Sequence, residues 1–161
     1  MQWVLDLKLL LLIGIANGTP VLSQKIFGDR LAFPIDGGRR LNGEPLLGHA
    51  KSLRGVVLSI LVSAVCGVLL GFSWATGALA GAMAMLGDMF SSFVKRRMRL
   101  APSSMALGLD QVPESLFPLL ACAPFLGLTA SDMACVVLAF FVLELFVSKL
   151  LFKLHLRDRP Y

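Results

Sequence analysis

Residues 56–94 read VVLSILVSAVCGVLLGFSWATGALAGAMAMLGDMFSSFV, and this stretch decides the fold. It contains two apolar runs, 56–71 and 75–94, separated by the short turn Phe72-Ser73-Trp74. Crossing the hydrocarbon core of a bilayer takes roughly 20 apolar residues in a helix, which satisfies its own backbone polar groups in lipid. We therefore expect two membrane-spanning helices joined by a tight turn.

Three further apolar runs lie outside this stretch, at 4–22, 112–128 and 133–154. Of the 161 residues, 57% are hydrophobic and only 16% are charged, whereas about a quarter of a soluble domain is charged. The sequence thus predicts an all-α integral membrane protein, residues 1–161 forming a single domain of about five transmembrane helices.

Two of these apolar runs contain proline, and in the first of them a glycine lies close to it. The first ends in Asn17-Gly18-Thr19-Pro20, and the fourth contains Pro118 and Pro124. Because proline removes a backbone donor and glycine has low helix propensity, we expect a weakened or broken first helix and an interrupted fourth helix.

The basic residues predict the orientation of the chain in the membrane. They gather between the first and second runs, between the third and fourth, and at the C-terminal end: Lys25, Arg30, Arg39, Arg40, Lys51 and Arg54; Lys95, Arg96, Arg97 and Arg99; Lys149, Lys153, Arg157 and Arg159. By the positive-inside rule, the long first loop and the C-terminus are cytoplasmic and the N-terminus lies outside. This pattern accounts for the net charge of +5 without nucleic acid, and it predicts a multi-pass plasma-membrane protein.

One group of polar residues lies at the end of the third run. Asp88, Ser91 or Ser92, and Lys95 are spaced to share a helix face. A carboxylate within an apolar helix is costly and indicates a functional site. Asp88 is suited to Mg²⁺, and Lys95 with Arg96 to phosphate oxygens. The alternative is an Asp88 ion pair beside a basic topology anchor.

A second group, Asp110-Gln111-Val112-Pro113-Glu114, opens the fourth run. Acidic residues stabilise a helix N-terminus, so Asp110 is either a cap or a ligand. If it lies on the same side of the membrane as Asp88, the two carboxylates are suited to the metal ion of a nucleotide triphosphate.

The first loop supplies glycine and basic residues, in Asp36-Gly37-Gly38-Arg39-Arg40 and in the segment 48–55. These residue types suit close contact with phosphates, or else contact with anionic lipid headgroups. Asn17 and Thr19 fit either a broken helix that exposes polar groups at a site or a kink. Glu144, in the fifth run, fits either a structural role within the bundle or a place in a site, and we favour the structural role.

Taken together, these segments resemble the CDP-archaeol synthase family of small integral membrane cytidylyltransferases. The matching stretches, in order, are 16–22, 36–40, 51–55, 87–96 and 110–111. The resemblance implies five helices and a Mg²⁺-dependent reaction of CTP with a lipid phosphate, giving CDP-lipid and pyrophosphate. The lipid is an archaeal-type ether lipid phosphate or phosphatidic acid. Ser92, Lys95 and Arg96 are also distantly similar to a phosphatidate cytidylyltransferase pattern.

The resemblance assigns expected roles to particular residues on the cytoplasmic side. The expected catalytic residues are Asp88, Lys95, Arg96, Lys51 and Arg54, and the expected metal ligands are Asp88 and Asp110. The expected substrate-binding residues are Asn17, Thr19, Asp36, Gly37, Arg39, Arg40, Gly87, Ser91, Ser92 and Gln111.

The chain departs from the family at one motif. Family members often carry Asp-Gly-Lys-Thr-Trp-Arg-Gly, where this chain has His49-Ala50-Lys51-Ser52-Leu53-Arg54-Gly55. An alternative function is therefore a non-catalytic membrane protein that binds anionic lipid headgroups. Magnesium-dependent CTP binding distinguishes the two.

Overall fold

The computed structural model describes residues 2–101, 104 and 106–153. This part of the chain forms five α-helices: α1 (Trp3–Phe27), α2 (Leu53–Leu69), α3 (Trp74–Arg97), α4 (Gln111–Leu126) and α5 (Ala130–Lys153). Each corresponds to one of the predicted runs; residue 154, the predicted end of the fifth run, lies outside the described residues. The sequence did not predict the small antiparallel hairpin of β1 (Arg40–Leu41) and β2 (Glu44–Pro45) in the first loop.

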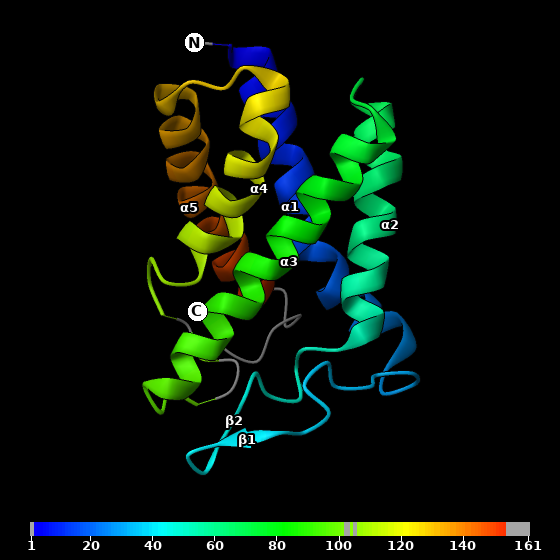
Figure 1. Ribbon diagram of the computed structural model, residues 1–161, viewed down its shortest axis with the longest axis vertical. Coiled ribbons are helices and arrows are strands. Elements are labelled where there is room, and N and C mark those ends of the chain that lie inside the picture. The colour runs from blue at the N-terminus through cyan, green and yellow to red at the C-terminus, as the bar shows by residue number, and fades with distance from the viewer. Residues whose placement is uncertain (1, 102–103, 105, 154–161) are drawn as a thin grey trace.

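The helices form a bundle with its polar loops at one end (Figure 1). The β1–β2 hairpin lies at the same end as the C-terminus of α3 and the start of α2, and the N-terminus and the α2–α3 turn lie at the other. A core of Leu9, Ile13, Leu119, Val136 and Phe140 joins α1, α4 and α5. This arrangement brings the two basic loops close together.

Within the described residues, three helices are long and apolar enough to cross a membrane: Trp3–Phe27, Trp74–Arg97 and Ala130–Lys149. Helix α2 is apolar but has 17 residues, and α4 has 16, so both are shorter than a typical span. The expectation of membrane helices is confirmed, whereas five crossings and their orientation stay a prediction.

Helix α1 is not broken at Gly18 and Pro20, contrary to the prediction; it continues to Phe27. Proline at position 20 cannot donate to the carbonyl of Ala16, four residues earlier. That carbonyl instead accepts a hydrogen bond from Ser59 Oγ of α2, at 2.7 Å, with both residues buried. A neighbouring helix thus replaces the missing donor. Helix α4 is likewise continuous through Pro118 and Pro124, so the predicted interruption is also wrong.

Small residues allow α3 to pack closely on its neighbours. A Cβ added to Gly77 would lie 2.4 Å from the Ser63 carbonyl oxygen of α2, and one added to Gly87 would lie 2.2 Å from the Pro113 carbonyl oxygen of α4. Such close backbone contact is typical of glycine-mediated packing between membrane helices. Gly87, expected to bind substrate, therefore lies in the α3–α4 contact.

Candidate functional site

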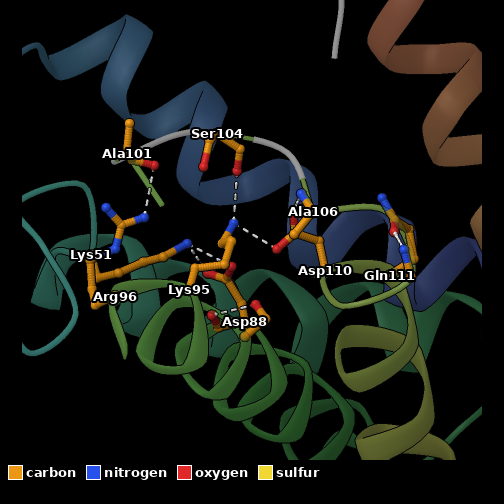
Figure 2. A network of polar contacts seen from close by, with 11 residues as sticks. Lys51, Asp88, Lys95, Arg96, Ala101, Ser104, Ala106, Asp110 and Gln111 are labelled. Carbon is orange, nitrogen blue, oxygen red and sulfur yellow. Dashed lines mark hydrogen bonds and ion pairs between the residues drawn. The ribbon is translucent and has the colours of Figure 1, made fainter. Parts of the chain in front are cut away.

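An ion pair joins the first loop to α3. Lys51 Nζ lies 2.6 Å from both Oδ1 and Oδ2 of Asp88, and the two side chains are 24% and 21% exposed (Figure 2). Lys51 is positioned by the backbone: its carbonyl accepts from Ile35 N–H at 2.9 Å, and the next residue, Ser52, caps α2. The structure thus brings together two expected catalytic residues that are 37 positions apart.

A second ion pair lies farther along α3. Lys95 Nζ lies 2.6 Å from Asp110 Oδ1 and donates to the Ser104 carbonyl at 3.1 Å (Figure 2). Asp110 Oδ2 accepts from Ala106 N–H at 2.9 Å, and the side chain makes no cap hydrogen bond to α4. Asp110 therefore occupies the N-cap position of α4, but its side chain holds the α3–α4 loop to Lys95 instead of capping the helix by a hydrogen bond.

Buried hydrogen-bond donors surround the second pair. Arg96 is only 3% exposed, and its Nη2 donates to the Ala101 carbonyl at 2.9 Å. Gln111 is fully buried, and its Oε1 accepts from Gly108 N–H at 2.7 Å. In the described part of the chain, Arg96 Nε and Gln111 Nε2 have no hydrogen-bond partner. Unpaired buried donors are rare in native proteins, and here they are suited to an anionic ligand.

Glu114 is a component of the site to which the sequence assigned no role beyond opening the fourth run. Its buried carboxyl group contacts that of Asp88, and it interacts electrostatically with Glu144 and Lys51. The contact depends on Gly87, whose missing side chain lets the backbone of Pro113 and Glu114 approach α3. The Gln111–Glu114 spacing places both residues on one face of α4, a signal that was available in the sequence.

Asp36 organises the first loop instead of pointing to a ligand. Its carboxylate accepts hydrogen bonds from the N–H groups of Gly38, Leu47 and Gly48, at 2.9, 2.9 and 3.2 Å. Burial by itself raises the pKa of Asp36, but these backbone hydrogen bonds outweigh it and the pKa lies below its ordinary value. Gly37, at φ 58°, provides the turn that follows.

Other expected residues lie outside the two ion pairs. Arg54 donates to Gln24 Oε1 at 2.7 Å and to the carbonyls of Gly28 and Arg30, and its guanidinium stacks on Phe27, so it faces the end of α1. Arg39 and Arg40 are exposed on the hairpin segment.

Three small polar side chains, Asn17 and Thr19 of α1 and Ser91 of α3, bond within their own helices. Asn17 Nδ2 donates to the Ile13 carbonyl and Thr19 Oγ1 to that of Ile15, so they do not line a broken helix. Ser91 Oγ donates to the Asp88 carbonyl, and Ser92 is buried beside it.

The carboxylates of the site fit Mg²⁺ only in a limited way. Among the described residues, no three His, Cys, Asp or Glu side chains form a metal-binding cluster. Magnesium in nucleotide sites is usually held by one or two carboxylates together with phosphate oxygens. Asp88, with Glu114 beside it, meets that smaller requirement, and oxygen is the ligand atom that Mg²⁺ prefers.

Long apolar helices with a network of acids and bases at one end are the features of an integral membrane protein. A family model described as "CarS-like: CDP-archaeol synthase" matches residues 72–161. The chain belongs to the CDP-archaeol synthase family, which confirms the resemblance seen in the sequence.

Individual relatives agree with this assignment. A CDP-archaeol synthase of Sulfurisphaera tokodaii is 30% identical over 91% of this chain and 84% of its own length. One from Thermofilum pendens is 30% identical over 100% of this chain and 79% of its own length. One from Hyperthermus butylicus is 41% identical over 60% of this chain and 59% of its own length. A solved structure of an intramembrane enzyme for archaeal membrane lipid biosynthesis superposes with a TM-score of 0.75 at 30% identity, covering 87% of this chain and 90% of that one.

Proposed function

We propose that this protein transfers the cytidylyl group of CTP to an archaeal-type ether lipid phosphate, forming CDP-lipid and pyrophosphate. The observation that carries the proposal is the Lys51–Asp88 ion pair, because it joins the first loop to α3 through the two family-matching motifs. The lipid class follows from the relatives, which are named CDP-archaeol synthases. The departure at His49 and Ala50 leaves this pair in place.

The reaction is a direct displacement at phosphorus. An oxygen of the lipid phosphate attacks the α-phosphorus of CTP, the bond from that phosphorus to the bridging oxygen breaks, and pyrophosphate leaves. The attacking phosphate is already an anion, so this step needs no general base. Catalysis then rests on positioning the substrates and stabilising negative charge.

Lys51, Lys95 and Arg96 carry the positive charge needed to stabilise the triphosphate. Lys51 and Lys95 are each paired with a carboxylate at 2.6 Å, and each would exchange it for phosphate oxygens when the triphosphate binds. Arg96 brings a buried cation with an unpaired Nε, and Gln111 an unpaired amide nitrogen. These donors would stabilise charge on the triphosphate where water is largely excluded.

Magnesium would be held by Asp88, with Asp110 or Glu114 as the second carboxylate, and would neutralise charge on the phosphates. We place the site at the cytoplasmic boundary of the plasma membrane, with the N-terminus outside and five crossings. This location lets a soluble nucleotide meet a substrate held in the membrane.

The test uses the purified chain in detergent with labelled CTP, Mg²⁺ and either an ether lipid phosphate or phosphatidic acid. We expect CDP-lipid, with the ether lipid phosphate preferred, and no product after Mg²⁺ is chelated. A folded protein that forms no product from either lipid, yet binds anionic vesicles without Mg²⁺-dependent CTP binding, would be a headgroup-binding protein and would contradict the proposal.

A further inference from the structure

An apolar groove of about 420 Å³ lies between α3, α4 and the first loop. Its lining comes from α3, from α4 and from the loop after β2: Leu86, Met89, Phe90 and Phe93; Phe117; and Leu46 and Leu47. The α3 residues follow the spacing of one helix face. The volume lies within the roughly 300–1,000 Å³ that is usual for small-molecule sites.

Two of the segments that line the groove, α3 and the first loop, also carry the Lys51–Asp88 ion pair. On α3, Met89 directly follows Asp88 in the sequence. On the loop side, Leu47 lies four residues before Lys51, whose Nζ bonds Asp88. The groove and the charged pair are therefore built on neighbouring residues of α3 and of the first loop.

The groove also opens on the outer surface of a membrane-spanning helix. Leu86 and Phe90 are 46% and 47% exposed, and both lie in the apolar helix Trp74–Arg97. Across the groove, the rings of Phe90 and Phe117 are 5.7 Å apart. An exposed apolar surface on such a helix suits contact with lipid, so the groove is accessible to a chain from the bilayer.

The loop wall of the groove is held in place by polar contacts. Leu47 N–H donates to Asp36 Oδ2 at 2.9 Å, which fixes the backbone beside the leucine pair. Arg97, at the end of α3, donates to the carbonyls of Leu41 and Pro45 at 2.7 and 2.6 Å, and Figure 1 shows the hairpin at this end of α3. Two leucines of a polar loop are thereby kept against an apolar helix face.

We propose that this groove binds a hydrocarbon chain of the lipid phosphate while its phosphate lies at the Lys51–Asp88 end. The inference rests on the proposed function and adds to it the residues that select the chain. An amphiphile with one phosphate matches an apolar groove that is accessible from lipid and has a charged pair on neighbouring residues. Leu86 and Phe90 would then set how much chain the site accepts.

The test fills the groove from its lipid-facing side. In Leu86→Trp, the larger ring occupies space needed by the chain, whereas Leu120→Trp places the same ring on α4 at a position that is 52% exposed and outside the groove lining. The assay measures kcat/KM for ether lipid phosphates with full-length isoprenoid chains and with chains cut to one isoprene unit.

We expect Leu86→Trp to lower the ratio of long-chain to short-chain kcat/KM about tenfold, as if one or two methylene groups were displaced. Leu120→Trp should keep the native ratio. An unchanged ratio in a folded, active Leu86→Trp would overturn the groove assignment. If the native protein makes CDP-lipid from neither substrate, the proposed function fails independently of this comparison.

Photo-crosslinking gives a second measurement that needs neither turnover nor a variant. A lipid phosphate with a photoreactive chain should label the peptide containing Phe90, and excess unlabelled lipid phosphate should suppress the labelling. Equal labelling by a diether lipid without phosphate would assign the groove to a structural bilayer lipid. Crosslinks between two copies of the chain at this face would assign it to an oligomer contact. Either result would overturn the proposal.

Discussion

Two basic residues of the first loop, three positions apart, have different surroundings. Lys51 Nζ contacts Asp88, a carboxylate within an apolar helix, while Arg54 packs on Phe27 and bonds backbone carbonyls at the end of α1. A buried carboxylate and its partner mark a functional site in a membrane protein. Arg54, by contrast, bonds backbone carbonyls at the end of α1, so its main effect is to hold the first loop in place.

We therefore expect the two side chains to differ on substitution. Lys51→Met should lower kcat by about 100-fold, the typical loss when one charge-stabilising donor is removed, with the protein still folded. Arg54→Met should lower the unfolding temperature and change kcat of the folded protein only a few-fold. Steady-state kinetics and thermal unfolding in detergent measure both. If Arg54→Met lost kcat as severely as Lys51→Met at unchanged stability, Arg54 would belong to the catalytic group, as its sequence motif suggested.

At the scale of the helices, Pro20 and Ser59 show how α1 and α2 depend on each other. The Ala16 carbonyl that Pro20 leaves without a donor is satisfied by Ser59 Oγ, at 2.7 Å. Buried backbone acceptors without a partner are costly, above all where no water is present. The continuity of α1 is therefore a property of the helix pair.

Removing this hydroxyl should destabilise the bundle. Ser59→Ala is expected to lower the free energy of unfolding by about 1 kcal/mol, because the buried Ala16 carbonyl loses its partner. Ser63, one turn later, is the matched control: it is equally buried, and its Oγ has no hydrogen-bond partner among the described residues, so Ser63→Ala should be close to neutral. Denaturant titration in mixed micelles compares them, and equal losses for both variants would argue against the interhelical bond.

Asp36 makes the first loop sensitive to pH in a defined direction. Its pKa is lowered in the folded protein, so its carboxylate stabilises the loop above the ordinary aspartate pKa of about 3.9, and this contribution is lost as pH falls through the folded value. Hydrogen exchange should show the Gly38, Leu47 and Gly48 amides protected at pH 5 and losing protection only below about pH 4.

Asp36→Asn should remove most of that protection at pH 5, since an amide replaces the carboxylate that accepts the three bonds. Asp29→Asn is the control, because Asp29 is exposed and accepts from Gln24. Native-like protection in Asp36→Asn would show that the loop is held by other contacts.

The helices, and the residues that share one helix face, could be predicted from the sequence. The contacts between residues far apart in the sequence could not. The seven-residue spacing of Asp88 and Lys95 follows from helix geometry, and both side chains do form ion pairs with the loops. The local sequence does not predict that Asp88 pairs with Lys51, or that Lys95 pairs with Asp110. These partners depend on how the loops pack against the helices. The continuity at Pro20 and the place of Glu114 likewise depend on neighbouring helices.

At the scale of the whole molecule, the polar loops gather at one end of the bundle (Figure 1). This is the end that the positive-inside rule places in the cytoplasm. The hairpin and the α3 C-terminus lie there, and the α2–α3 turn lies at the opposite end. An N-terminus outside and a C-terminus in the cytoplasm require an odd number of membrane crossings.

Cysteine labelling tests the orientation. In a chain whose Cys66, Cys122 and Cys135 are replaced, single cysteines at His49 and Arg99 should react with a membrane-impermeant reagent only from the cytoplasmic side. A single cysteine at Trp74 should react only from outside. All three positions are exposed. Labelling of positions 49 and 74 from the same side would exclude the proposed topology.

If the proposed function is right, CDP-lipid forms at the site containing Asp88. The most direct measurement compares native protein, Asp88→Asn and Asp29→Asn in the same assay with labelled CTP, Mg²⁺ and ether lipid phosphate, after size-exclusion chromatography has confirmed folding. We expect CDP-lipid from the native protein and from Asp29→Asn, and none above background from Asp88→Asn. A folded Asp88→Asn with native turnover would contradict it.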